Sequence, residues 1–552
     1  MIERNLERLK PDEQAVLEGA SVVGSEFSAA LVAAAVERPQ TEVEACCTRL
    51  SRHEQFVARQ GPVFWPDGTI AAGFRFHHAL YQEVLYDRLS VSHRLQLHQR
   101  IAVREEAGYG ERADEIATEL AHHYSLANIK NKAIQYFRVA GERAVARGAV
   151  VEAEEQYRCA LKLLGELPQT IDRDQQELVL QLALSNVLWG SRSWAHSETK
   201  RAYTRALELS ERLGETTKLV GVLKGLVVSA LGNAQFKLAQ ELPERMLAAA
   251  ERSGAHAALC SAHSLLGQSL IWRAQYVDAQ KHLELAGIHY NGGDRDEFGL
   301  MGIDALALAA IATLLQGFPE RAGQLMDTAS RHAEGCNDPF WVGLVHVWGV
   351  FLCCLLHDGS AAIDHAKVLS RLAATQPVFT GLSDVYMGRA LMLQGHWEEG
   401  VGYLRKAIAF HKANGLLAEL MRVKLDEAEF FANQGRIDDG LALIESALTD
   451  SEELAQIRPP ALRQRANLLA QSDADPSTIE EAYRAAFKCA RSQGARYYEL
   501  ETTTNYARWL KSRGRAADAH VMLAEIYNWF TEGFDTFTLR EAKKLLDELA
   551  GG

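Results

Sequence analysis

A phrase of about 20 residues recurs along most of this chain, at a step of about 40 residues. In the copy LGQSLIWRAQYVDAQKHLELA, Leu266 and Gly267 are followed by Tyr276, Ala279 and Leu283. The last three are separated by steps of three and four residues, which place side chains on one face of a helix. The pattern predicts pairs of antiparallel helices, each pair with a buried seam of its own, stacked one after another along the chain.

A small residue in the second helix marks each copy of the phrase. It falls at Ala239, Ala279, Ala322, Ala362, Gly400, Gly440, Ala482 and Ala519. The unit resembles the tetratricopeptide repeat (TPR), although its step is longer than the roughly 34 residues of the standard repeat. Gly267, Gly395 and Gly435 are expected where two helices approach closely, so that a bulky side chain there disrupts the packing.

The repeats determine the predicted fold class, which is all-α. With 552 residues the chain exceeds a single compact core, and a solenoid solves this because each unit contacts only its neighbours. Proline is rare, with 12 residues, and alternating apolar and polar runs are scarce. We therefore expect a TPR-like α-solenoid superhelix that follows a small N-terminal winged-helix domain. The expected domains are a winged helix over 1–90, a helical connector over 91–130 and about ten TPR-like helix pairs over 131–552.

The first 90 residues do not follow the repeat. Three helices and two strands are predicted there, at Leu6–Gly24, Ser25–Glu37, Thr41–His53, Gln55–Gln60 and Gly73–His77. Ser25 is expected to cap the second helix, and Thr41 with Glu44 matches a capping box for the third. Three helices followed by a two-stranded wing predict a winged-helix arrangement.

Composition excludes several classes of protein. The net charge is −13 without any basic block, which argues against a nucleic-acid surface across the whole chain. None of the eight cysteines forms a CxxC pair, which indicates reduced thiols in a cytoplasmic protein. The opening MIERNLERLKPDEQ is too charged for a signal peptide. The apolar run over Phe340–Leu356 is expected to be a buried helix rather than a membrane span, because the repeat passes through it.

Two segments resemble a known family. They are the stretch over 65–125, which contains GFRFHHALYQEVLYDRL, and GFDTFTLREAKKLLDEL over 533–549. Both resemble the C-terminal half of bacterial STAND-type signalling ATPases. In that family an output domain, often an adenylate/guanylate cyclase or a DNA-binding domain, precedes an ATPase, a winged helix and TPR-like sensor repeats. The resemblance covers essentially the whole chain, and its sharpest motif is FHHAL at Phe76–Leu80. It implies a regulatory sensor module rather than an enzyme.

Motifs for catalysis and metal binding are missing from the sequence. It contains no GxxxxGK[ST] phosphate loop, no HExxH zinc motif and no GxSxG nucleophile motif. The adjacent pairs His77–His78 and His122–His123 would point about 100 degrees apart on a helix and so cannot readily share a metal. We therefore predict no catalytic residue, no metal ligand and no cofactor. The ATPase or cyclase would belong to a separate chain or be lost.

His78 is the candidate for nucleotide sensing. The resemblance implies that a histidine at the end of the winged helix contacts the β-phosphate of ADP and holds the protein inactive, and FHHAL places His78 there. An imidazole N–H can donate to a phosphate oxygen. The alternative is a histidine that caps the helix beginning near Ala79.

The superhelix is the expected binding surface for a protein partner or a small ligand. First helices of TPR-like units line the concave face. The repeat register places Gln268, Trp272, Phe351 and Arg389 on that face. The alternative is that these side chains belong to the core.

A second hypothesis is a transcriptional regulator that binds DNA through the predicted third helix. Arg49, Arg52 and His53 favour contact with phosphates, whereas Glu42 and Glu44 oppose it. The balance favours a regulatory winged helix that does not bind DNA.

Overall fold

Helices form nearly all of the regular structure in the computed structural model, which describes residues 9–52, 56–290, 300–450 and 454–550. The predicted positions of His53 and Gln55 lie outside the described residues. The chain divides into two compact units, Met1–Val187 and Leu188–Gly552, and the division falls within helix α10 (Ile171–Ser191). The domain boundaries predicted at residues 90 and 130 stay predictions.

The first unit begins with four helices and three strands among the described residues. They are α2 (Pro11–Val23), β1 (Glu26–Ser28), α3 (Ala29–Val36), α4 (Gln40–Arg52), β2 (Val57–Phe64), β3 (Ile70–Phe76) and α5 (Ala79–Arg88). The strands form one antiparallel sheet in the order β1-β3-β2. Phe27 of β1 stacks on Phe74 of β3, with ring centroids 5.9 Å apart, and both rings are buried against the helices.

Strand β1 corrects the prediction of a helix starting after Ser25. Burial of Phe27 and pairing with β3 hold residues 26–28 extended, so the helix begins only at Ala29. Ser28, not Ser25, caps it, because the Ser28 hydroxyl accepts a hydrogen bond from the Leu31 N–H at 3.3 Å. The third helix begins at Gln40, and Glu44 accepts a hydrogen bond from the Ala72 N–H of β3 instead of acting in a capping box.

The remainder of the first unit is helical. Its elements are α6 (Val91–Tyr109), η1 (Gly110–Ile116), α7 (Ala117–Leu126), α8 (Lys130–Ala146), α9 (Val150–Gly165) and most of α10. Glu106 of α6 joins three of them, because Tyr124 of α7 and Lys132 and Tyr136 of α8 all donate hydrogen bonds to its carboxylate.

Two neighbouring histidines of the first unit, buried His98 and half-buried His123, share a hydrogen bond. The Nδ1 atoms of His98 and His123 lie 2.9 Å apart, which requires one donor and one acceptor. Burial lowers the pKa of each ring to about 4, and for His98 the neighbouring His123 adds to this effect. The rings are therefore neutral in the fold, while the unfolded chain takes up protons near pH 6.5.

We expect stability to fall as the pH drops from 6.5 towards 4, because the unfolded state then binds more protons than the folded state. The loss should be on the order of 2 kcal/mol for each of the two rings at pH 5. Melting curves of the wild type and of His98→Asn at pH 7 and pH 5 measure it. The wild type should lose more stability on acidification than the variant, and equal losses would contradict the prediction.

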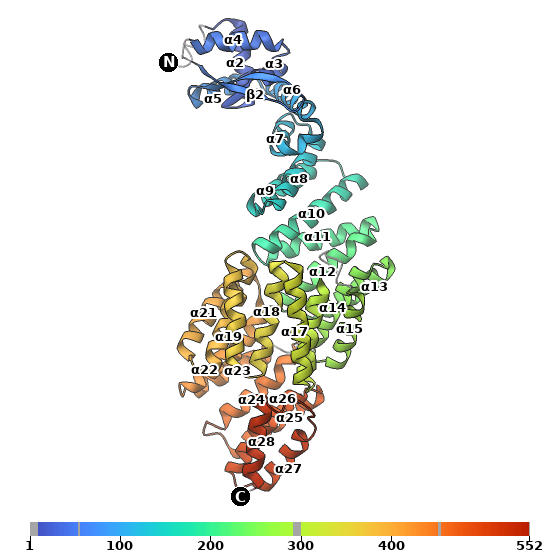
Figure 1. The fold of residues 1–552 in the computed structure, drawn as a ribbon, viewed down its shortest axis with the longest axis vertical. Helices are drawn as coiled ribbons and strands as arrows, with labels where there is room; N and C mark the ends of the chain where they lie inside the picture. The colour runs from blue at the N-terminus through green and yellow to red at the C-terminus, as the bar shows by residue number, and fades with distance from the viewer. Residues whose placement is uncertain (1–8, 53–55, 291–299, 451–453, 551–552) are drawn as a thin grey trace. The chain divides into compact units, whose positions relative to one another are not determined.

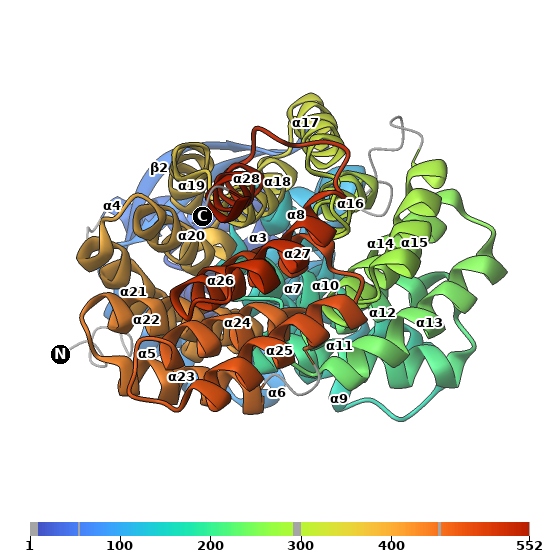
Figure 2. The ribbon, with the colours of Figure 1, turned by 90° about the horizontal axis from the view of Figure 1, so that it is seen from below.

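The second unit contains helix pairs in sequence. They are α11 (Ser197–Leu213), α12 (Thr216–Gly232), α13 (Phe236–Ser253), α14 (His256–Trp272), α15 (Tyr276–His289), α16 (Met301–Leu315), α17 (Pro319–Cys336), α18 (Pro339–Leu355), α19 (Gly359–Ala373), η2 (Pro377–Phe379), α20 (Thr380–Leu393), α21 (Trp397–Asn414), α22 (Leu417–Asn433), α23 (Ile437–Asp450), η3 (Ala455–Ile457), α24 (Arg458–Leu469), α25 (Pro476–Ser492), α26 (Arg496–Ser512), α27 (Ala516–Tyr527) and α28 (Phe537–Ala550). Figure 1 shows these helices following one another as antiparallel pairs. In Figure 2, α13 and α15 lie outside α12 and α14. This is the predicted all-α, TPR-like superhelix.

The eight small residues predicted at the helix seams are all buried. Most turns inside the pairs, though not the one between α24 and α25, share a second feature, a residue in the left-handed region of φ. This residue is alanine at two turns, with φ of 55° at Ala234 and 58° at Ala274, histidine at one, His357, and glycine at others, with 84° at Gly395 and 72° at Gly435. Glycine is favoured at such a position because a Cβ is strained there. The turn geometry thus explains why the QG dipeptide recurs in the sequence.

This geometry corrects part of the expectation for the glycines. Gly267 does lie at a close approach, since a Cβ there would come within 2.6 Å of Leu283. A Cβ on Gly395 or Gly435 would meet nothing within 4 Å. Those two glycines serve the left-handed turn, and the close helix contact beside Gly395 is made by Gly388 and Gly400 instead.

The superhelix curls tightly enough for distant first helices to touch. Helix α12 contacts α22, and α16 contacts α26. The loop between α27 and α28 also reaches back to the turn before α17: the Gly533 N–H donates to Glu320 at 2.9 Å, and the Trp529 ring lies 5.5 Å from that of Phe318. The second unit is therefore held by contacts between residues about 200 positions apart, as well as between neighbours.

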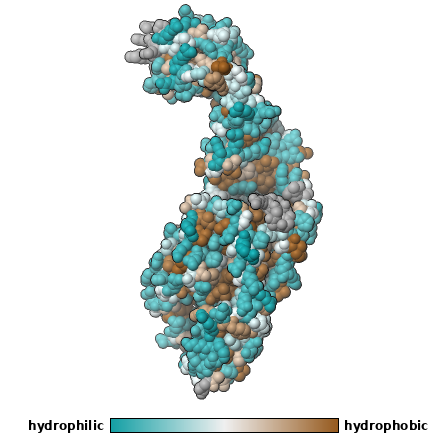
Figure 3. Space-filling model, viewed as in Figure 1, coloured by the Kyte–Doolittle hydropathy of each residue, from teal (hydrophilic) through white to brown (hydrophobic). Residues whose placement is uncertain are grey.

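The apolar run predicted to be a buried helix is α18, whose side chains pack inside the superhelix. None of the helices in the described part of the chain has the length and apolar character needed to cross a membrane. On the face shown in Figure 3, hydrophobic side chains lie in small patches among hydrophilic ones. That face therefore offers no single continuous apolar surface. Large aromatic side chains gather instead inside the superhelix.

Candidate functional site

An arginine on the inside of the superhelix organises the candidate site. Arg422 of α22 is 6% exposed, and its guanidinium carbon lies 4.8 Å from the ring centroid of Trp272 and 4.6 Å from that of Phe351. One guanidinium nitrogen donates to Oε1 of Gln456 at 2.6 Å. Trp348 completes the group, with its ring 6.1 Å from Trp272. We call Trp272, Trp348, Phe351, Arg422 and Gln456 the inner cluster.

The fold brings the inner cluster together from four separate elements. Trp272 ends α14, Trp348 and Phe351 lie one turn apart on α18, and Gln456 lies in the short η3 turn. Contacts of α12 with α22 and of α14 with η3 bring these elements together across the superhelix. The Trp348 indole N–H donates to Asp304 of α16 at 2.7 Å, which fixes its orientation. Burial raises the pKa of the Asp304 carboxyl to about 6.

A largely buried ion pair joins α20 to α22, the helix that carries Arg422. Arg389 of α20 donates to Asp426 of α22 at 2.6 Å, and the two side chains are 11% and 20% exposed. Burial alone would lower the pKa of Arg389, but the charge of Asp426 and other nearby groups outweighs it and raises that pKa. Arg389 is therefore a charged partner of Asp426 rather than a side chain projecting freely into a groove.

Several buried polar atoms near the cluster have no hydrogen-bond partner among the described residues. They include Nε2 of Gln456, Oε2 of Glu419 and the hydroxyl of Tyr276. Gln456 is completely buried and Tyr276 is 2% exposed. Unpartnered buried polar atoms are uncommon in folded proteins, because each costs about 1–3 kcal/mol. Such atoms mark places where a ligand or a bound water can supply the missing bond.

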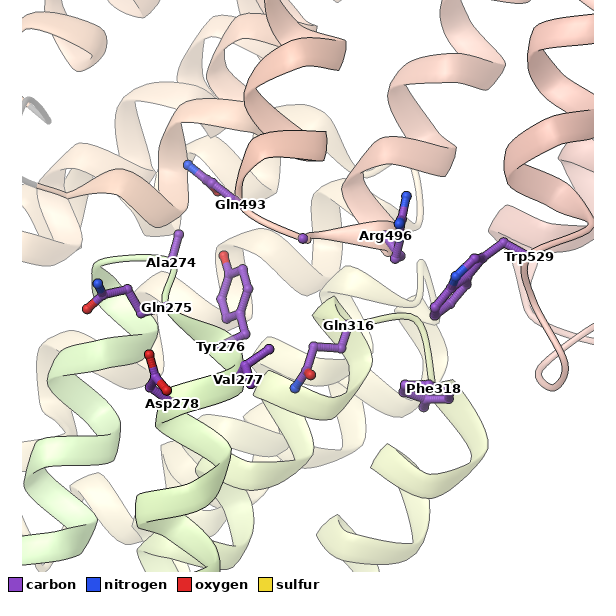
Figure 4. Close-up of a pocket in the computed structure, with 11 residues that line it drawn as sticks. Ala274, Gln275, Tyr276, Val277, Asp278, Gln316, Phe318, Gln493, Arg496 and Trp529 are labelled. Atoms are coloured by element: carbon purple, nitrogen blue, oxygen red, sulfur yellow. The ribbon is translucent and has the colours of Figure 1, made fainter.

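A pocket of about 270 Å³ lies beside the cluster, between helix turns. Tyr276, Gln316, Gln493, Arg496 and Trp529 contribute side chains to it, as Figure 4 shows. Gln493 donates to the Ala455 carbonyl at 2.8 Å, while its Oε1 is buried without a partner among the described residues. Tyr276 links the pocket to the inner cluster. Its ring lines the pocket, and its pKa is raised by burial, with the charge of Arg422 opposing that rise.

The residues predicted for ligand binding lie as follows. Gln268 is half-buried one helical turn before Trp272 on α14, Trp272 is half-buried, and Phe351 is 4% exposed. The structure joins Trp272 and Phe351 through Arg422, whereas Arg389 is bound to Asp426. Their binding role stays a prediction.

Sequence reasoning missed Arg422, Gln456 and Tyr276. A charged residue between the apolar Met421 and Val423 was the available signal for Arg422, but a surface helix has the same pattern. Gln456 lies in a 3-10 turn that no repeat register covers.

His78 lies at the start of α5 and caps it. Its Nδ1 accepts a hydrogen bond from the Leu80 N–H at 3.2 Å, and the side chain is exposed. Because Nδ1 is an acceptor, the neutral ring carries its proton on Nε2. Capping and donation to a phosphate therefore involve different nitrogens of the same ring. The nucleotide-sensing role of His78 stays a prediction.

Within the described ranges, no group of three or more His, Cys, Asp or Glu side chains could hold a metal ion. Four histidine pairs do occur, including His263 with His282 and His346 with His365. In these two pairs, burial lowers the pKa of His263 and of His346 to about 4.

Sequence similarity to a known protein covers one part of this chain. No protein-family model matches the sequence. An uncharacterised protein of Rhizobium meliloti, R02095, is 31% identical over 147 residues, which make up 26% of this chain and 14% of that protein. The chain thus spans only a small part of that relative.

Three solved structures are similar in fold. The apo form of RapI has 15% identity and a TM-score of 0.40, covering 51% of this chain and 98% of RapI. A STAND protein with a tetratricopeptide repeat sensor from Pyrococcus horikoshii has 12% identity and a TM-score of 0.33, covering 99% of this chain and 67% of that protein. The quorum sensor NprR from B. thuringiensis, in its apo form, has 13% identity and a TM-score of 0.39, covering 60% and 93%. At these values the likeness carries no argument about function.

Proposed function

We propose that this chain is a non-catalytic sensor module that binds a protein segment or a small ligand inside its TPR-like superhelix. The observation that carries the proposal is the inner cluster. Arg422 is buried between two aromatic rings, and neighbouring polar atoms lack hydrogen-bond partners within the described structure. A concave, largely apolar surface with a few convergent polar groups is the usual form of a ligand site.

We further propose that the module acts in a STAND-type signalling system and reports ligand binding to an ATPase or cyclase. The order of helices and strands in residues 11–88 and the FHHAL motif support this. The N-terminal region would then be a regulatory winged helix, with Nε2 of His78 as the donor to a nucleotide phosphate. The acidic side chains of α4 are the reason to prefer this role over DNA binding.

A non-catalytic role predicts that the chain neither hydrolyses ATP nor binds it tightly, because it lacks a loop that cradles phosphates. Isothermal titration with MgATP should give no micromolar binding. A single saturable site of micromolar affinity would contradict the proposal.

The ligand itself is sought by thermal shift with a library of peptides and metabolites. A true ligand should raise the melting temperature of the wild type and change the fluorescence of the tryptophans in the inner cluster. The variant for comparison with the wild type is Trp272→Phe, which removes one of these tryptophans but keeps an apolar ring in place. If no compound of the library acts at the inner cluster, the result would count against the proposal.

A further inference from the structure

Arg422 is a buried cation without a carboxylate in contact. No ion pair within 4.0 Å involves it among the described residues, and its one hydrogen bond goes to the neutral side chain of Gln456. The rings of Trp272 and Phe351 both lie against its guanidinium group. A guanidinium has five N–H donors in one plane, so the edge of Arg422 retains donors that these contacts do not use.

Two further polar groups without partners in the described structure belong to Gln456, which Arg422 contacts, and to Tyr276. Gln456 uses its Oε1 as the acceptor for Arg422, which leaves its buried Nε2 as a donor without an acceptor in the described structure. The Tyr276 hydroxyl is also buried and unpartnered, and it lies close enough for the charge of Arg422 to oppose the rise of its pKa. Arg422, Gln456 and Tyr276 can therefore each donate to a ligand, while Oε2 of Glu419, on the same helix as Arg422, is an acceptor without a partner among the described residues.

Two carboxylates on α22 moderate the positive charge. Glu419 lies three residues before Arg422, and Asp426 lies four residues after it, where it is held by Arg389. With Arg389 counted, two arginines and two carboxylates balance, so a ligand with two negative charges would be disfavoured more strongly than one with a single charge. A monoanionic, planar acceptor matches this balance and the fork of a guanidinium better than a dianionic phosphate.

We infer that the ligand of the inner cluster presents a carboxylate to Arg422, with the Gln456 amide and the Tyr276 hydroxyl as additional donors. The inference rests on the proposed function and specifies its ligand class. The carboxylate can belong to a carboxylic metabolite or to a peptide. The two aromatic rings hold the guanidinium plane in place before the ligand arrives, which reduces the entropy lost on binding.

The experiment uses trifluoroacetate as the probe, observed by 19F NMR on the full chain, with neutral trifluoroacetamide of matched size as the control ligand. Trifluoroacetate should show line broadening that depends on Arg422, and trifluoroacetamide should show little. In Arg422→Gln the binding should be about tenfold weaker, since a charge-assisted hydrogen bond is lost. Arg436→Gln is the matched control, because Arg436 also lies over an aromatic ring, Phe431, but is exposed and paired with Asp439.

Two more variants guard against simple misfolding. Arg422→Lys keeps the charge without the planar fork and should bind trifluoroacetate with intermediate strength. Tyr276→Phe removes an unpartnered hydroxyl, so the melting temperature should stay the same or rise while binding weakens. A structural role alone for Tyr276 would leave binding unchanged.

The outcomes separate the inference from the proposed function. Broadening that is equal in the wild type and Arg422→Gln overturns the carboxylate site. Inorganic phosphate that displaces trifluoroacetate and binds more tightly overturns the choice of carboxylate over phosphate. A library ligand that acts at the inner cluster but carries no anionic group would also overturn it, while leaving the proposed sensor function intact.

Discussion

Replacing Gly400 by valine is expected to destabilise the second unit strongly, whereas the same change at Gly402, on the same helix, is expected to have little effect. A Cβ on Gly400 would lie 2.7 Å from the Gly388 carbonyl oxygen and 2.5 Å from the Met392 side chain. The backbone of α20 has to move to relieve the first contact. Such overpacking costs about 1–3 kcal/mol, and occasionally more.

Gly402 supplies the control because a Cβ there would meet nothing within 4 Å. Gly402→Val should be nearly neutral, since valine is slightly better than glycine in a helix. Urea unfolding followed by tryptophan fluorescence measures both variants. Similar losses of stability at Gly400 and Gly402 would show that the close contact between α20 and α21 does not control packing.

Removing Arg389 is expected to cost about 3 kcal/mol, because it leaves Asp426 buried without its partner. An arginine that projected freely from the concave face would instead cost less than about 0.5 kcal/mol on replacement by alanine. The exposed pair Arg436–Asp439 has a similar distance of 2.6 Å, with side chains that are 56% and 52% exposed. Arg436→Ala should change stability by less than about 1 kcal/mol.

A double variant distinguishes loss of the pair from loss of general packing. Arg389→Met with Asp426→Leu replaces both charges by apolar groups, and much of the lost stability should return. Chemical unfolding of the two single variants and the double variant gives the coupling between the residues. If the double variant is as unstable as Arg389→Ala, the buried charge is not the cause.

The placement of glycines shows how far sequence reasoning reaches. It correctly placed Gly267 and Gly400 at close helix contacts, because small residues at helical spacing indicate a seam. It misplaced Gly395 and Gly435, which have positive φ in turns with open space around them. In the sequence, a glycine next to a helix start is consistent with a close helix contact and also with a left-handed turn. Only the backbone angles decide between the two.

The candidate site was predicted less completely than the fold. Helix periodicity indicates which side of a first helix is apolar, and the repeat register predicts Trp272 and Phe351 on the concave face. It does not say which side chains meet across the superhelix. Arg422 is 150 positions after Trp272 and contacts it all the same.

The sequence by itself determined the repeated helix pair, its buried small residues and the all-α class, because these depend on neighbours within about 40 positions. Only the tertiary structure decided the third strand, the partner of Arg389, the return of the C-terminal loop to the turn before α17, and the inner cluster. The physical reason is that the curl of a superhelix accumulates a small rotation from every repeat. Which distant side chains meet therefore depends on the sum of many packing contacts, and no single stretch of sequence records that sum.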